Sequence, residues 1–267
     1  MNQPTNPLNA GKPLLFAHRG SSLLAPENTF TAFDIGLQAS SDVLEIDVRL
    51  SRDKEVIVIH DERVDRTTDG SGAVSEHTLV HLKRLDAGYR FEDERGRLFR
   101  GRQLELPTLL ELYAAYPDVI VNIDIKDKRY LAARLVAKVI EKAGAERRTV
   151  VASFHGKVLR YFRQIAPHIA TSATFKEVLD LYLQGYRLKN RQAAPMSVAL
   201  QIPTRYGKLK LDTPRFIDTI HRSGQLANFW TVNDPQHMRM LLQHGADGIV
   251  TDRPDLAVEI FRELGFK

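Results

Sequence analysis

A closed (β/α)₈ barrel of the TIM type, with an insertion after its second strand, is the fold that the sequence predicts. The chain has 267 residues, close to the roughly 250 residues of a typical barrel of this kind. Short apolar segments alternate with helical patterns along almost the whole chain, which favours a parallel sheet covered by helices. One long segment, residues 61–106, interrupts this alternation.

The expected strands are short runs of apolar and β-branched residues. Such continuous apolar runs are typical of parallel strands, because both faces of a parallel sheet are buried. Eight runs of this kind occur, which is the number that closes a TIM barrel. They are Leu14–Ala17, Val43–Val48, Val119–Ile125, Thr149–Ser153, Ile169–Ala173, Ser197–Gln201, Gln225–Thr231 and Gly248–Thr251.

The expected helices are bounded by residues that favour helix ends. Asn28 suits the N-cap of one helix, and proline opens three others. Gly144, Gly224 and Gly245 each follow a helical pattern, as expected after a helix C-terminus. The predicted helices are Thr29–Gln38, Thr108–Tyr116, Arg129–Ala143, Thr213–Ser223, Asp234–His244 and Pro254–Leu264.

Residues 61–106 predict an insertion that caps one mouth of the barrel. The segment follows a short return strand, Val56–Ile59, and contains a short helical pattern near Thr78–Arg84. A connection this long inside a compact domain is usually functional. We therefore expect a single domain over residues 1–267, with 61–106 as its cap region.

Composition limits the classes of partner. Lys and Arg exceed Asp and Glu by 38 − 33 = 5, which suits a small anionic substrate and gives no indication of a nucleic-acid partner. The absence of Cys excludes disulfides and thiolate metal sites. No run approaches the roughly 20 apolar residues of a membrane span, and residues 1–12 lack the apolar core of a signal peptide. We therefore expect a cytoplasmic protein without stable membrane association.

The second predicted strand carries two carboxylates on one face. Glu45 and Asp47 are two positions apart, so their side chains project to the same side of the strand. In a barrel that side is the interior, since helices cover the outside. Two carboxylates in a low-dielectric interior repel each other and resist ionisation. A bound cation relieves this repulsion, and a pair of buried salt bridges is the alternative.

The next main strand extends this polar face. Asn122, Asp124 and Lys126 again share one side. Glu45, Asp47 and Asp124 together predict an oxygen-rich site for one divalent cation. Because thiolates are absent, Mg²⁺ or Ca²⁺ is favoured, and Mn²⁺ also accepts such ligands. Lys126 suits a phosphoryl oxygen of the substrate or a salt bridge to one of these carboxylates.

Two histidines follow strands at the predicted active-site rim. His18 ends the first strand, and His60 ends the short return strand. Barrel active sites lie at the C-terminal ends of the strands. The pair therefore predicts a general acid and a general base for a phosphodiester. Arg19, next to His18, suits bidentate recognition of a phosphate.

These residues belong to a series of short motifs that resembles the glycerophosphodiester phosphodiesterase family. The series runs in order from residue 16 to about 257, and its specificity comes from this order on the expected elements. The motifs are His18-Arg19-Gly20, Pro26-Glu27-Asn28-Thr29, Glu45-Ile46-Asp47-Val48, His60-Asp61, Arg66-Thr67-Thr68, Leu106-Pro107-Thr108-Leu109, Trp230-Thr231-Val232-Asn233 and Asp247-Gly248-Ile249-Val250-Thr251-Asp252-Arg253-Pro254.

The resemblance implies a TIM barrel that hydrolyses glycerophosphodiesters to sn-glycerol 3-phosphate and an alcohol, with one divalent cation. It also implies that Glu27 lies near the metal or orients its loop. The implied roles of the other residues are metal ligation for Glu45 and Asp47, acid–base catalysis for His18 and His60, and phosphate binding for Arg19 and Lys126.

Two positions depart from the pattern of the family. Asp124 stands where the family usually has Glu, which shortens the reach of this carboxylate by one methylene. Ser40-Ser41-Asp42 replaces Gly-Ala-Asp before the second strand, which changes a turn. The resemblance further implies that Phe154 and Trp230 flank the glycerol or alcohol moiety, with ordinary packing as the alternative.

Two other functions remain open from the sequence. A lysophospholipase D or phospholipase of the same superfamily would need an apolar lip for an acyl chain. Leu179–Leu188 could supply that lip, with Arg187, Lys189 and Arg191 to meet anionic lipid. A helix packed on the barrel, with a solvated loop, is the favoured interpretation of this stretch. An inactive barrel with a binding role is the other alternative, although every expected catalytic group is present.

Overall fold

Parallel strands form a closed barrel in the computed structural model, which describes residues 5–187 and 196–267. The barrel strands within these residues are β1 (Leu14–His18), β2 (Val43–Leu50), β4 (Ile120–Ile125), β5 (Thr149–Ala152), β6 (Ala170–Thr171), β7 (Ala199–Pro203), β10 (Leu226–Trp230) and β11 (Gly248–Thr251). Their order is β6-β5-β4-β2-β1-β11-β10-β7. A parallel bridge between Ser172 and Ala199 closes the ring between β6 and β7. The predicted TIM barrel is confirmed.

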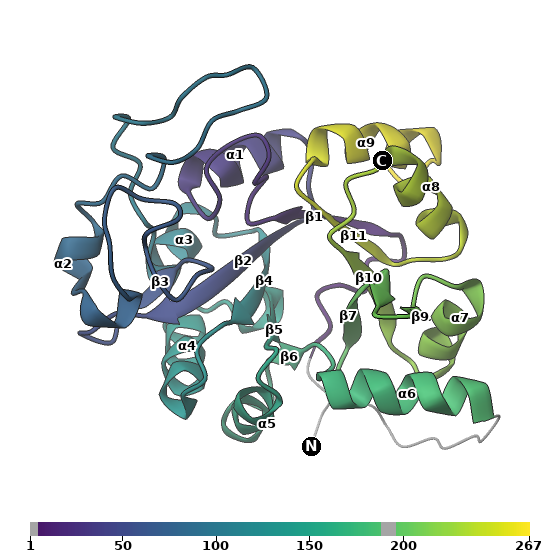
Figure 1. Ribbon diagram of the computed structural model, residues 1–267. Helices are drawn as coiled ribbons and strands as arrows, with labels where there is room; N and C mark the ends of the chain where they lie inside the picture. Colours follow the sequence, from purple (N-terminus) through teal and green to yellow (C-terminus); the bar gives the residue numbers. More distant parts are fainter. Residues whose placement is uncertain (1–4, 188–195) are drawn as a thin grey trace.

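Helices surround this barrel (Figure 1). One helix follows each barrel strand, apart from the insertions after β2 and β7. They are α1 (Phe30–Gln38), α2 (Leu79–Leu82), α3 (Leu109–Ala115), α4 (Tyr130–Lys142), α5 (Gly156–Ile165), α6 (Phe175–Arg187), α7 (Pro214–Arg222), α8 (Pro235–Gln243) and α9 (Pro254–Glu263), with short 3₁₀ turns at Val74–Glu76 and Glu146–Arg148. The sequence analysis had not predicted α5, and it had not predicted the start of α6, although it favoured a packed helix at Leu179–Leu188.

The barrel interior is apolar at one end and charged at the other. A buried apolar cluster in the barrel interior includes Phe16, Val43, Val150 and Val250. Towards the C-terminal ends of β2 and β4, acidic and amide side chains occupy the positions that face the barrel interior. The parallel register sets Asp47 beside Asp124, because strand alternation keeps paired residues on the same face. The polar end therefore lies at the C-terminal mouth.

The insertion after β2 has a small core of its own. It begins with β3 (Val56–Val58), which pairs antiparallel with β2. Val64, Val74 and Leu82 pack with residues of β3 in a separate buried cluster. Phe99, farther along the insertion, packs against Ala32 of α1. The insertion is thus attached to one side of the barrel rather than detached from it.

A second, unpredicted insertion lies between β7 and α7. It is a small antiparallel hairpin of β8 (Arg205–Tyr206) and β9 (Leu209–Lys210). The predicted lipid-binding lip at Leu179–Leu188 coincides with α6 as far as the described residues go. Its remaining part, with Lys189 and Arg191, lies outside the described residues. None of the described helices is long and apolar enough to cross a membrane.

Candidate active site

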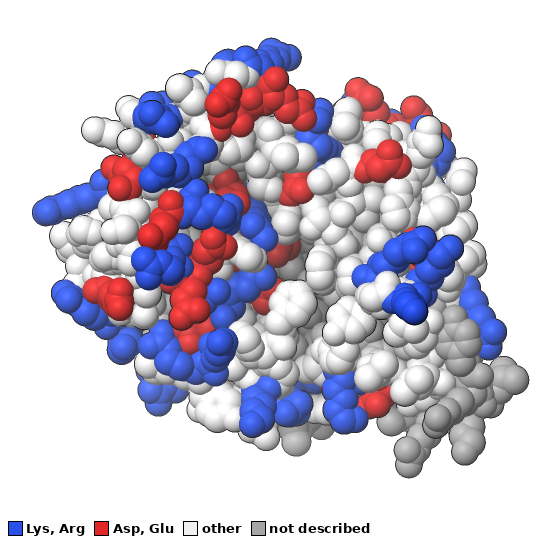
Figure 2. All heavy atoms as spheres, viewed as in Figure 1, with Lys and Arg blue, Asp and Glu red and all other residues white. Residues whose placement is uncertain are grey.

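Charged side chains gather at the C-terminal mouth of the barrel. Figure 2 shows acidic and basic residues crowded along one side of a central hollow, whereas the other side carries fewer charges. Neighbouring strands supply the inner members of this group. Register pairs His18 of β1 with Glu45 of β2, and Asp47 of β2 with Asp124 of β4. The structure therefore brings these four predicted residues to one rim.

Lys126 joins the two buried aspartates. Its Nζ lies 2.7 Å from Oδ2 of Asp124 and 3.1 Å from Oδ1 of Asp47. Burial opposes ionisation of Asp47, but Lys126 and Arg19 outweigh it and hold the pKa of Asp47 below its ordinary value. Burial raises the pKa of Asp124 in spite of the nearby ammonium. Of the two roles predicted for Lys126, the salt bridge is present.

Glu45 belongs to the same group of carboxylates. Its Oε2 accepts the backbone N–H of Arg19 at 3.0 Å and lies 3.9 Å from Nε2 of His18. Burial and the adjacent Asp47 carboxylate raise the pKa of Glu45 to about 7. Burial therefore disfavours the charged form of Glu45 and of Asp124, whereas the nearby cations keep Asp47 ionised.

The ligating atoms of the three carboxylates have the chemistry that a hard divalent cation requires. All their ligating atoms are oxygen, which Mg²⁺ and Ca²⁺ prefer. Oδ1 of Asp124 is buried and accepts no hydrogen bond from the residues that the structure describes. Within those residues, no three His, Asp or Glu side chains are arranged to hold a metal ion directly. Lys126 stands between Asp47 and Asp124, so ligation by the full set remains a prediction.

Arg19 reaches the site through an unusual backbone conformation. Its φ is 50°, a left-handed value, and Gly20 follows with φ 93°. A Cβ on Gly20 would lie 2.7 Å from the backbone of Ala32, so the turn has no room for another residue type. This turn directs the guanidinium inward, with Nε 3.1 Å from Oδ2 of Asp47 and Nη1 3.0 Å from Oε1 of Glu27.

Arg66 connects the insertion to this rim. Its guanidinium donates to both carboxylate oxygens of Glu27 at 2.7 Å and to Oδ2 of Asp61 at 2.6 Å. Burial works against ionisation of Asp61, yet hydrogen bonds from Arg66 and His60 lower its pKa to about 2. Glu27 is thus held by Arg66 and by Arg19, and Arg19 in turn contacts Asp47, so Glu27 lies at the edge of the carboxylate group.

Each predicted catalytic histidine has its own aspartate. His18 Nδ1 lies 2.5 Å from Oδ1 of Asp252, and His60 Nδ1 lies 2.7 Å from Oδ1 of Asp61. Burial opposes protonation of His18, but Glu45 and Asp252 outweigh it and raise the pKa of this imidazole. For His60 burial prevails and lowers the pKa.

The contact between His18 and Asp252 was not predicted from the sequence. Asp252 is fixed by two further donors, the Ser22 hydroxyl and Nδ2 of Asn233 at 2.7 Å. Burial opposes its ionisation, but the hydrogen bonds, led by that from His18, lower its pKa to about 2. The signal available was the position of Asp252 directly after the last strand, beside the first strand in a closed barrel.

Phe154 and Trp230 form an aromatic pair at the mouth. Their ring centroids are 5.7 Å apart in an edge-to-face arrangement. Phe154 is 63% exposed, and Lys126 Nζ lies 5.2 Å from its ring centroid. An exposed aromatic ring beside a charged centre is accessible to a ligand. Contact of Phe154 and Trp230 with the substrate stays a prediction.

Comparisons with known proteins identify the family of this chain. The sequence profile of the glycerophosphoryl diester phosphodiesterase family matches residues 18–256. The chain belongs to this family. It is 33% identical to a glycerophosphodiester phosphodiesterase of Caldanaerobacter subterraneus, over 95% of this chain and 100% of that relative. A glycerophosphodiester phosphodiesterase of Bacillus altitudinis is also 33% identical, over 94% and 98% of the two chains.

Solved structures show the same fold. A glycerophosphodiester phosphodiesterase of Agrobacterium tumefaciens superposes with a TM-score of 0.76 at 28% identity, over 92% of this chain and 99% of that one. A phosphodiesterase of Oleispira antarctica, solved with its product sn-glycerol-3-phosphate, gives 0.77 at 24% identity, over 96% and 99%. The predictions of family and enzyme class are confirmed: the protein is a phosphoric diester hydrolase of the glycerophosphodiester type.

Proposed function

We propose that the mouth of this barrel hydrolyses glycerophosphodiesters to sn-glycerol 3-phosphate and an alcohol with one divalent cation. The observation that carries the proposal is the juxtaposition of buried carboxylates, two basic side chains and two aspartate-paired histidines on adjoining strands or just after their ends. The product bound to the Oleispira antarctica relative supports the choice of a glycerol phosphate product.

Glu45, Asp47 and Asp124 would hold the cation. The buried, unbonded Oδ1 of Asp124 and the raised pKa of Glu45 both indicate carboxylates that a cation would stabilise. When bound, the cation supplies a Lewis acid that stabilises charge on the phosphoryl group. Mg²⁺, Ca²⁺ and Mn²⁺ all suit the oxygen ligands.

Lys126 and Arg19 would bind the phosphate. Both cations now face Asp47, the central carboxylate of the group. Once that carboxylate is otherwise neutralised, the ammonium and the guanidinium can turn to phosphoryl oxygens. The planar guanidinium suits two oxygens at once, and the ammonium acts as a point charge.

His18 and His60 would exchange protons with the substrate. In each imidazole the aspartate engages Nδ1, which leaves Nε2 for the reacting atoms. One histidine takes a proton from the nucleophile, either water or the substrate's own 2-hydroxyl, and the other protonates the leaving alkoxide. Asp252 and Asp61 act as positioning residues, because each fixes the orientation of its imidazole.

The aromatic pair and the insertion would select the substrate. Phe154 and Trp230 give the mouth an apolar wall for the carbon atoms of the glycerol or alcohol. Residues 61–106 join the rim through Arg66 and through Glu94, which lies 2.7 Å from Arg253. Attached in this way, the segment caps one side of the mouth and restricts the size of the substrate.

Analysis of the products tests this function. Purified enzyme with Mg²⁺ or Ca²⁺ is incubated with glycerophosphocholine, and choline and sn-glycerol 3-phosphate are quantified while ³¹P NMR follows the phosphorus. We expect equimolar release of both products, and His60→Ala should release neither at a comparable rate. A cyclic phosphate signal before the final product would identify the 2-hydroxyl as nucleophile. Failure to release sn-glycerol 3-phosphate would contradict the proposal.

A further inference from the structure

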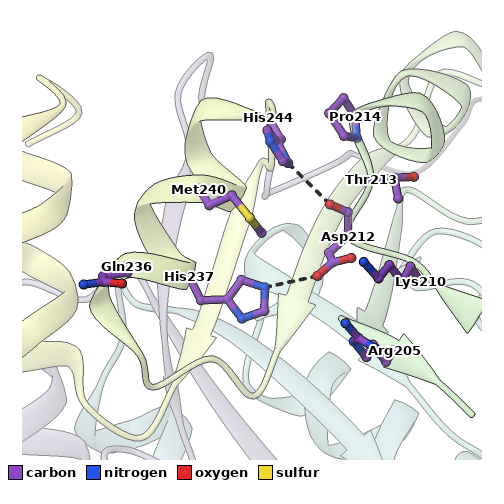
Figure 3. Close-up of a pocket in the computed structure, with 9 residues that line it drawn as sticks. All are labelled: Arg205, Lys210, Asp212, Thr213, Pro214, Gln236, His237, Met240 and His244. Atoms are coloured by element: carbon purple, nitrogen blue, oxygen red, sulfur yellow. Dashed lines mark hydrogen bonds and ion pairs between the residues drawn. The ribbon is translucent and has the colours of Figure 1, made fainter. Parts of the chain in front are cut away.

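A cavity distinct from the catalytic group lies between α7, α8 and the β8–β9 hairpin (Figure 3). Its volume is about 630 Å³. The residues that matter for its chemistry are Arg205, Lys210, Asp212, His237, Met240 and His244. None of them belongs to the catalytic mouth described above.

The hairpin presents its two faces to different neighbours. Register pairs Arg205 with Lys210 and Tyr206 with Leu209. Because side chains alternate along a strand, the two cations share one face and the two apolar residues share the other. The Tyr206 ring packs on Phe175 of α6, with centroids 5.1 Å apart. This contact places Tyr206 beside α6, whereas Arg205 and Lys210 line the cavity.

Both cations are exposed, and no carboxylate of the described residues lies within ion-pair distance of either. Like charges directly opposite each other on two strands destabilise the pairing. Among the described residues, no Asp or Glu forms an ion pair with Arg205 or Lys210, and residues 1–4 and 188–195 contain neither residue type. Asp212 lines the cavity, but its Oδ2 lies 3.2 Å from Nε2 of His237.

Hydrogen bonds hold the side chains on the α8 side of the cavity. His237 lies on α8 and His244 follows its last residue as the C-cap, and His244 Nδ1 is 3.4 Å from the backbone oxygen of Asp212. Asp212 therefore links both imidazoles to the start of α7. Met240, between them on the same helix, adds an apolar surface that suits the carbon atoms of a ligand.

We propose that this cavity binds a phosphate dianion, carried by inorganic phosphate or by a small phosphate monoester. Arg205 supplies a planar fork and Lys210 a point charge, the pair of donors that suits a tetrahedral anion with two negative charges. The bound anion would offset the repulsion between the two cations. The proposal is independent of the reaction at the barrel mouth.

The imidazole signals of the protein provide a test that separates the two sites. His237 and His244 report on the cavity, whereas His18 and His60 report on the catalytic mouth. Each signal is assigned by substitution of that histidine, and ¹H–¹⁵N spectra are recorded as inorganic phosphate or sn-glycerol 3-phosphate is added at constant ionic strength. The variants compared are Arg205→Gln/Lys210→Gln and a control with the same loss of charge on α4, away from the cavity, Lys138→Gln/Lys142→Gln.

We expect saturable shifts of the His237 and His244 signals in the wild type. The Arg205→Gln/Lys210→Gln variant should bind at least about tenfold more weakly, since two charge-assisted hydrogen bonds are lost. The control should bind within about twofold of the wild type. Tighter binding of sn-glycerol 3-phosphate would identify a monoester site, and equal binding a phosphate site. Absent shifts, unchanged affinity in the first variant or an equal loss in both would overturn the proposal.

Discussion

Replacement of Asp252 by Asn tests whether this aspartate positions a catalytic histidine. Asp252 accepts from His18 Nδ1 at 2.5 Å and from Asn233 Nδ2 at 2.7 Å. Asn has nearly the same shape but only one carbonyl oxygen, so one of these donors meets an amide N–H instead. When the amide nitrogen faces His18, the imidazole is driven to carry its proton on Nε2, the atom directed at the substrate.

The structure sets the size of the expected effect. Hydrogen bonds to charged groups contribute roughly 1.5–3 kcal/mol, and about 1.36 kcal/mol corresponds to a tenfold change in rate. Both side chains are more than four-fifths buried, so solvent weakens the interaction little. We therefore expect kcat for Asp252→Asn to fall by roughly 10- to 150-fold, with little change in KM.

The chain offers a matched control for this substitution. Asp247, before the same strand, forms another His–Asp pair with His221 at 2.8 Å, away from the catalytic mouth. Asp247→Asn should leave kcat unchanged. Steady-state hydrolysis of glycerophosphocholine gives kcat and KM, and thermal unfolding reports on stability. A normal kcat in Asp252→Asn, or an equal loss of kcat in both variants, would refute the positioning role.

The remaining predictions concern the acid–base pair, the insertion and the substrate. His18→Ala and His60→Ala should each lower kcat by roughly a hundredfold or more; folded variants with near-normal kcat would exclude these roles. Arg66→Ala, which removes the tie to Glu27 and Asp61, should raise KM several-fold, and an unchanged KM would argue against a cap held by Arg66. The ratio kcat/KM should favour glycerophosphocholine over lysophosphatidylcholine under identical metal conditions, and a clear preference for the lipid would contradict the proposed cap.

The parts predicted from sequence follow from local periodicity. The spacing of Glu45 and Asp47 fixes their common face, and parallel strands with inward faces then bring Asp124 beside them. The helix after Thr213 was recognisable because its cap and proline are encoded locally, and Thr213 does accept the N–H of Phe216. Such features need no knowledge of the tertiary structure.

The parts that were missed depend on weaker or more distant signals. α5 begins at His155-Gly156 without a side-chain cap, so its start carried no marker. The start of α6 was also missed, although it does have a marker, since Thr174 and Glu177 exchange hydrogen bonds in the pattern of a capping box. The hairpin after β7 is too short for a periodic signal. The link between His18 and Asp252 spans 234 positions and exists only because β11 closes against β1.

Dependence of hydrolysis on a divalent cation tests the central claim most directly. The enzyme is dialysed against excess EDTA, and glycerophosphocholine hydrolysis is measured before and after Mg²⁺, Ca²⁺ or Mn²⁺ is restored, with Asp47→Asn as the control that lacks the central carboxylate. The three carboxylates predict that activity is lost in EDTA and returns with at least one of these cations in the wild type, but not in the variant. Full activity of the dialysed enzyme in excess EDTA would contradict the account.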